Sequence, residues 1–101
     1  MPGHPLAAIW KLDPDLKSHI ERANEFTYND GALSKKFKLL IALAIDAALG
    51  RDQGVKSLAK QAQIAGASIK DITEALRVAY HLTGVQSVYT ASLGLEEFAN
   101  L

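Results

Sequence analysis

The chain has 101 residues, 49% of them apolar, and its eleven Lys and Arg residues balance eleven Asp and Glu residues. This length fits one domain, and the lack of a long basic tract argues against broad electrostatic binding of nucleic acid. Cysteine is absent, which excludes disulfides, thiolate metal sites and thiol redox chemistry.

Residues 1–12 predict an N-terminal arm, because they hold two of the three prolines and end in an apolar stretch that includes Trp10. No charged leader precedes a long apolar run here, so no signal peptide is expected. The longest apolar run, Leu39–Ile45, is too short to span a bilayer. We therefore expect no membrane partner and a cytoplasmic location.

The first helix is predicted to begin at Asp13-Pro14-Asp15, where Asp13 caps, Pro14 suits the first turn and Asp15 complements the helix dipole. Asn29-Asp30-Gly31 ends it. Its apolar stripe consists of Leu16, Ile20, Ala23 and Phe26.

The second helix is predicted to run from Ser34 to Gly50, and between residues 37 and 49 only Lys38 and Asp46 are not apolar. A helix that is apolar all round is buried on all sides. A chain this small has little material to surround such a helix. Either it is the central helix of a bundle, or other copies of the chain cover it, and any ligand cleft then forms at that seam.

Three further helices are predicted, at about 52–65, from Ser68 to near Gly84, and from Val85 to about Leu93. Ser68 and Asp71 form a capping box that opens the middle one. The inward stripe of the first of these helices is predicted to be Val55, Leu58, Ala59, Ala62 and Ala65. That of the second is predicted to be Ile72, Ala75, Leu76, Ala79 and Tyr80. In the third, Val88, Tyr89 and Ser92 share one face.

No segment alternates between apolar and polar residues as a strand would, so the fold class is predicted to be all-α. We expect a small bundle of about five helices in one domain, residues 13–101, that follows the arm. The glycine-rich patterns of nucleotide sites are absent, and no two histidines stand at metal-ligand spacing. The sequence therefore predicts no cofactor and no metal.

The stretch from Leu33 to Ala91 resembles the carboxymuconolactone decarboxylase family, whose superfamily includes the alkylhydroperoxidase D-like proteins. The resemblance rests on the order and spacing of several elements: Leu49-Gly50-Arg51, Gly66-Ala67-Ser68, Ile72, Glu74-Ala75-Leu76 and Gly84-Val85. It implies a small helical bundle that assembles into homo-trimers or homo-hexamers.

Two sets of catalytic residues implied by this resemblance are missing. The peroxidase branch resembles Cys-x-x-Cys-x-x-x-His, whose positions hold Arg51, Gly54 and Leu58 here. A cysteine-dependent peroxidase is excluded, because no thiolate exists. The decarboxylase branch resembles Leu-Gly-Arg-x-x-Glu-Leu-x-x-x-His, so Gly54 stands at the glutamate and Leu58 at the histidine.

Glu74, Arg77 and His81 are three and four residues apart and share one face of a predicted helix. Such a histidine suits a general acid or base near neutral pH, with Glu74 as a second catalytic group and Arg77 binding substrate. The alternative is a ladder of surface charges in which His81 is favourable near the helix C-terminus.

Asp46 interrupts the apolar helix in its last turn, where a carboxylate opposes the helix dipole. Arg51, Lys56, Arg77 or His81 could offset this cost. We predict Asp46 as a catalytic group and Arg51 as a ligand for a substrate carboxylate. The alternatives are a structural ion pair for Asp46, a helix-capping role for Arg51, and packing roles for the aromatic residues.

Two functions remain open from the residues. One is a decarboxylase-like lyase or binder for a small organic acid or lactone, which uses acid–base chemistry without thiols. The other is a non-catalytic oligomeric protein, with a structural or interaction role, that has lost the activity.

Overall fold

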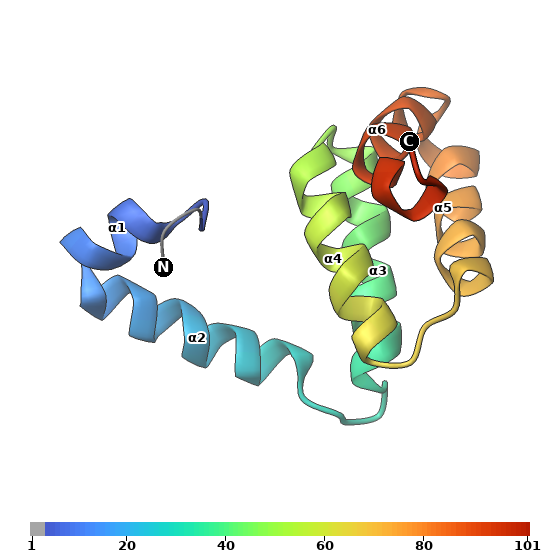
Figure 1. The fold of residues 1–101 in the computed structure, drawn as a ribbon. Helices are drawn as coiled ribbons and strands as arrows, with labels where there is room; N and C mark the ends of the chain where they lie inside the picture. The colour runs from blue at the N-terminus through green and yellow to red at the C-terminus, as the bar shows by residue number, and fades with distance from the viewer. Residues whose placement is uncertain (1–3) are drawn as a thin grey trace.

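Six α-helices and one short 3-10 helix follow one another in the computed structural model, which describes residues 4–101 (Figure 1). They are α1 (Ala7–Leu12), α2 (Pro14–Tyr28), α3 (Lys35–Ala48), α4 (Asp52–Ile64), α5 (Ile69–Thr83), α6 (Gln86–Gly94) and η1 (Glu96–Ala99). No strand occurs among these residues. The prediction of an all-α fold is confirmed.

Short polar residues begin the helices where the sequence predicts it. The side chain of Asp13 accepts a hydrogen bond from the Leu16 amide at 3.0 Å, and Ser34 accepts one from Phe37 at 3.3 Å. Ser68 and Asp71 exchange side-chain to backbone hydrogen bonds at both ends of a capping box. Each satisfies amide groups that have no partner within the helix.

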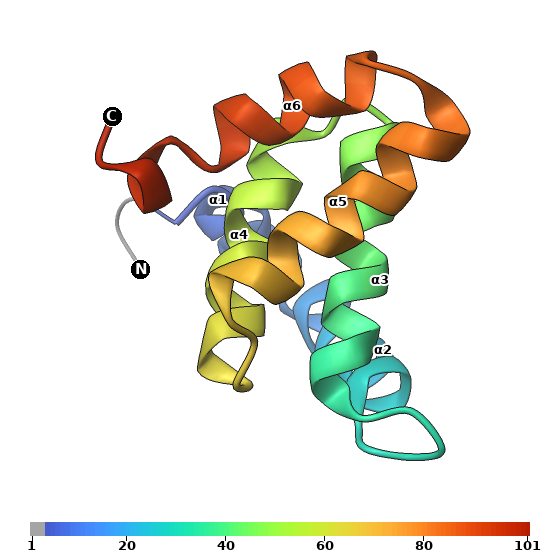
Figure 2. The same ribbon diagram turned by 90° about the vertical axis from the view of Figure 1, so that its right-hand side faces the viewer.

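The core lies between α3 and the three helices that follow it, α4, α5 and α6 (Figure 2). Its largest fully buried side chains are Leu39, Leu43, Val55 and Ile72. The apolar stripe predicted for α4 is confirmed, because Val55, Ala59 and Ala62 are buried and Leu58 and Ala65 pack against them.

The predicted inward stripe of α5 needs one correction. Ile72 and Ala79 are buried as expected, but Tyr80 is 49% exposed. It lines an outer groove between α5 and α6 instead of the core. The reason lies in α6, whose buried face consists of small residues, Ser87, Thr90, Ala91 and Gly94, so α6 approaches the core too closely to leave room for an aromatic ring.

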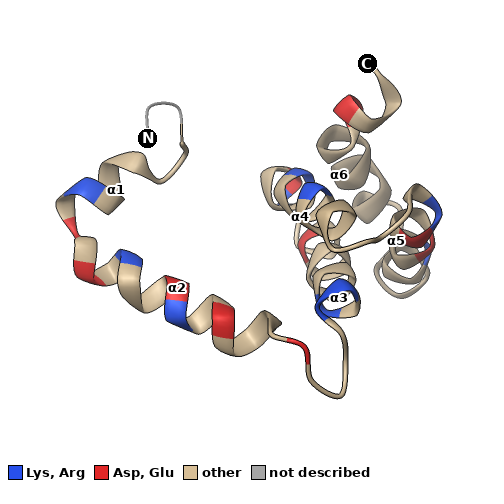
Figure 3. Cartoon of the chain, turned by 60° about the horizontal axis from the view of Figure 1, so that its bottom comes forward, with Lys and Arg blue, Asp and Glu red and all other residues tan. Residues whose placement is uncertain are grey.

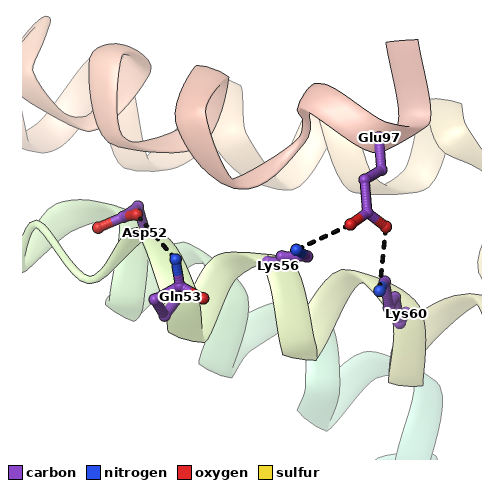
Figure 4. A network of polar contacts seen from close by, with 5 residues as sticks. All are labelled: Asp52, Gln53, Lys56, Lys60 and Glu97. Atoms are coloured by element: carbon purple, nitrogen blue, oxygen red, sulfur yellow. Dashed lines mark hydrogen bonds and ion pairs between the residues drawn. The ribbon is translucent and has the colours of Figure 1, made fainter. Parts of the chain in front are cut away.

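An ion-pair network holds η1, which the sequence did not predict, against α4 (Figure 4). The carboxylate of Glu97 lies 2.7 Å from Lys56 Nζ and 3.0 Å from Lys60 Nζ. Hydrogen bonds from these two ammonium groups lower the pKa of Glu97, and Glu97 in turn raises the pKa of Lys56. Because all three groups are exposed, the network positions η1 more than it stabilises the fold.

The helices α1 and α2 together project away from the bundle (Figures 1 and 3). Neither contains a buried residue. They contact each other, and α2 also contacts α3. We call α1 and α2 the arm. This arm is longer than the one predicted for residues 1–12. The predicted domain boundary between residues 12 and 13 stays a prediction.

One side of α3 is buried and the opposite side is exposed. Leu39, Leu40, Leu43 and Ala47 belong to the core. Phe37, Ile41, Ile45 and Leu49 are 52%, 49%, 53% and 58% exposed, and we call these four residues the α3 stripe. None of the helices between residues 4 and 101 has the length and apolar character needed to cross a membrane.

Candidate functional site

The corner between α3 and α4 brings Asp46 and Arg51 together. Gly50 adopts a φ of 77°, which favours glycine, and the chain then turns back so that the Arg51 amide donates to the Asp46 carbonyl at 2.9 Å. The guanidinium of Arg51 lies 3.6 Å from the carboxylate of Asp46. The side chain of Asp46 is only 17% exposed, whereas that of Arg51 is 66% exposed.

Gly54, in the first turn of α4, makes room for this carboxylate. A Cβ at position 54 would overlap Oδ2 of Asp46 and lie 2.8 Å from its Cγ, closer than real contacts allow. The carboxylate of Asp46 therefore rests directly against the backbone of residue 54.

The location of the carboxylate also explains how its electrostatic cost is offset. In the last turn of α3, a negative charge opposes that helix's dipole. The same charge lies beside the first turn of α4, where the dipole favours it, and Arg51 adds a full positive charge. Of the partners that the sequence offered for Asp46, the structure places Arg51 at ion-pair distance.

A polar groove lies further along the same face of α4. Arg51, Gly54, Leu58 and Gln61 follow one another at steps of three or four, so they share a helix face. Near Leu58 a groove of about 300 Å³ opens between the end of α2, the start of α3 and α4. Its polar lining comes from Asn24, Glu25, Tyr28, Asn29, Lys35 and Gln61. The sequence missed this groove, because its residues come from three helices.

The other three predicted site residues are on α5, and no ion pair joins them to Asp46 or Arg51. The side chains of Glu74, Arg77 and His81 are all exposed, and within residues 4–101 no ion pair or hydrogen bond joins them. Arg77 lies at an apolar groove of about 340 Å³ between α5 and α6. His81 is in the last turn of α5, where a positive charge is favourable.

The described residues contain no group of three or more His, Asp and Glu side chains arranged to hold a metal ion. The groups available for chemistry at the α3–α4 corner are the mostly buried carboxylate of Asp46, the exposed guanidinium of Arg51 and the N-terminus of α4. These groups are suited to hold an anion and to exchange a proton with it.

Comparison with known proteins gives three findings. The model of the carboxymuconolactone decarboxylase family matches residues 14–97. The uncharacterized protein MJ1511 of Methanocaldococcus jannaschii is 24% identical over 99 residues, which are 98% of this chain and 92% of that protein. The crystal structure of apo-lpg0406, a carboxymuconolactone decarboxylase family protein from Legionella pneumophila, superposes with a TM-score of 0.85 at 28% identity, covering 94% of this chain and 85% of that one.

Proposed function

Because this chain belongs to the carboxymuconolactone decarboxylase family, we propose that it acts on a small organic acid or lactone by acid–base chemistry at Asp46. The observation that carries the proposal is the contact between the Asp46 carboxylate and the backbone of Gly54. The decarboxylase pattern has a glutamate at position 54. Here the position is glycine, and Asp46 of α3 places its carboxylate where the Cβ of that glutamate would lie.

Arg51 is proposed to bind the carboxylate of the substrate. A guanidinium has five N–H donors, and one ion pair with Asp46 leaves most of them free. Because its side chain is 66% exposed, Arg51 is able to reach a ligand while it keeps Asp46 in position.

In the proposed reaction, Asp46 takes a proton from the carbon next to the substrate's carboxyl or lactone carbonyl. The electrons of the broken C–H bond move onto the carbonyl oxygen, where the positive charge of Arg51 stabilises them. The protonated Asp46 then returns the proton. A decarboxylation would use the same groups: Asp46 takes the proton of the substrate's carboxyl group, and the bond between the carboxyl carbon and its neighbouring carbon then breaks. Carbon dioxide leaves, the electrons of that bond move onto the conjugated carbonyl oxygen beside Arg51, and the protonated Asp46 delivers its proton to the remaining carbon.

Thermal shift against small carboxylic acids and lactones tests the binding step. We expect the melting temperature to rise with ligand concentration, as it does for any ligand that binds only the folded state. Arg51→Gln should remove the shift, and Arg22→Gln, on the arm, should keep it. A shift that is lost in Arg77→Gln and kept in Arg51→Gln would move binding to the α5–α6 groove and contradict the assignment.

Proton exchange tests the chemical step. An acid that binds is incubated with the protein in deuterated water, and NMR follows the loss of its C–H signal. Asp46→Asn should keep the thermal shift and lose the exchange. If exchange instead survives in Asp46→Asn and disappears in His81→Gln or Glu74→Gln, the α5 residues carry the chemistry.

A non-catalytic oligomeric protein is the second candidate, favoured by Leu58 at the position of the expected histidine and by the exposed α3 stripe. This candidate predicts that no acid or lactone changes the melting temperature and that Asp46→Asn affects only stability.

A further inference from the structure

The α3 stripe is a continuous apolar surface. Phe37, Ile41, Ile45 and Leu49 recur every four residues and are each about half exposed. At a rise of 1.5 Å per residue, the stripe extends over about 18 Å. Exposed apolar side chains are common singly, but a row of three along α3, continued by Leu49 at its C-cap, indicates a contact surface.

The arm has little support from its own bundle, which it meets through the end of α2, where Tyr28 packs against the core. The 15 residues of α2 include no buried residue, and Phe26 is 89% exposed. In α1, Leu12 is 80% exposed. A single helix of about 15 residues is marginal in water, so packing must supply the missing stability of α2.

The exposed surface of the chain matches what an obligate assembly buries. A compact monomer of 10.9 kDa exposes about 5,600 Å² by the usual scaling, whereas this chain exposes 7201 Å². A standard interface covers about 800 Å² per partner, and obligate interfaces cover more. The surplus of about 1,600 Å² is as large as one partner's share of an obligate interface. The radius of gyration, 14.4 Å, also exceeds the value of about 12.7 Å for a compact chain of this length.

We propose that the arm of one copy docks on the α3 stripe of a second copy. The lengths agree, because α2 extends over about 22 Å and the stripe over about 18 Å. The charges are opposite in sign, since the arm with Asp13 carries four carboxylates and three cations, whereas α3 carries three lysines and one aspartate. Both surfaces belong to the same chain, so every copy offers one arm and one stripe, and a closed symmetric assembly covers all of them.

Cysteine crosslinking tests this contact directly, because the natural chain contains no cysteine. Two variants of the full chain are co-expressed, one with Ala23→Cys on α2 and one with Phe37→Cys, Ile41→Cys or Ile45→Cys on the stripe. A short bismaleimide, which tolerates differences in register, should join the two variants into a product of twice 10.9 kDa. A chain with one cysteine cannot crosslink within itself.

The matched control places the second cysteine at Leu82, which is 77% exposed on α5 and lies outside the stripe. This pair should give no crosslink. If the stripe variants crosslink only to one another, the stripe meets a second stripe and the arm is not its occupant. If no stripe position reacts with Ala23→Cys, the proposal is also wrong.

A second measurement uses the mass in solution. Ile41→Glu should reduce the assembly seen by sedimentation to a monomer with an unchanged circular dichroism spectrum, while Leu82→Glu should keep the natural mass. A natural chain that sediments as a monomer at micromolar concentration would overturn the proposal. These readouts report association alone, so their outcome does not depend on the proposed activity.

Discussion

At the residue scale, the corner between α3 and α4 depends on one missing side chain. Gly54 leaves open the space that the carboxylate of Asp46 fills, and Arg51 holds that carboxylate from the other side of the turn. The sequence predicted Asp46 and Arg51 as site residues, but it gave Gly54 only as a lost catalytic position. Gly54 makes room for the Asp46 carboxylate only because α3 and α4 approach each other closely.

Gly54→Ala tests this contact, because the sign of the change in stability depends on whether Asp46 occupies the space beside residue 54. Within a helix, replacing glycine by alanine normally stabilises a protein by about 0.5–1 kcal/mol. Here the overlap with Asp46 should make the change destabilising, by about 1 kcal/mol, as measured by urea denaturation. Gly31→Ala is the control, because its Cβ would meet only Lys38 Nζ, at 3.8 Å.

A double-mutant cycle gives a sharper version of this test. In an Asp46→Ala background, the space beside residue 54 is free, so Gly54→Ala should become stabilising. The same destabilisation in both backgrounds would show that Asp46 does not occupy this space.

At the scale of single elements, α6 packs closely through small residues. A Cβ at Gly94 would lie 2.7 Å from Val55 Cγ1 and 2.8 Å from the carbonyl oxygen of Asp52. The second contact is with backbone, which cannot rotate away. The missing side chain of Gly94 therefore allows α4 and α6 to pack closely. Val88 and Tyr89 lie on the exposed face of α6.

Gly94→Ala should therefore destabilise the fold by about 1–3 kcal/mol, since α6 must move outward to admit the methyl group. Urea denaturation of this variant, compared with the exposed neighbour Ser92→Ala, provides the measurement. Equal midpoints for the two variants would contradict the close packing of α6 on α4.

The capping box of α5 predicts a pH dependence. The hydrogen bond from the Ser68 amide lowers the pKa of Asp71, and the pKa of Glu97 is lowered by Lys56 and Lys60. Groups with lowered pKa values stabilise the fold above their ordinary pKa, and this contribution is lost as the pH falls through the lowered value. The melting temperature should therefore fall below about pH 4.

Asp71→Asn should weaken this acid dependence, because an amide does not titrate. Glu74→Gln, on the same helix and outside the capping box, is the matched control and should leave the dependence unchanged. Identical acid profiles for Asp71→Asn and the natural chain would show that the box does not contribute to it.

At the scale of the whole molecule, two surfaces remain uncovered, the arm and the α3 stripe. The proposed docking of a second copy there would occur only in the folded state, so association would add to stability. The melting temperature should rise with protein concentration, and Ile41→Glu should remove this dependence. A melting temperature that is independent of concentration in the natural chain would argue against coupled association.

The sequence by itself determined α2 to α6, the caps at Asp13, Ser34 and Ser68 and the family resemblance, because these depend on residues close together in the chain. It predicted neither α1 nor η1. Ser34, Gly50 and Ser68 mark boundaries that the structure confirms. The sequence also indicated that α3 is apolar on every side, and its exposed stripe agrees with this.

Only the tertiary structure decided which side chains meet. It placed Asp46 against Gly54 and Arg51, formed no ion pair between these residues and Glu74, Arg77 or His81, and left Tyr80 at the surface. Helical periodicity assigns residues to a face of their own helix, but it contains no information on the distance between two helices. That distance depends on small residues such as Gly54 and Gly94, whose effect appears only when a second helix lies against them.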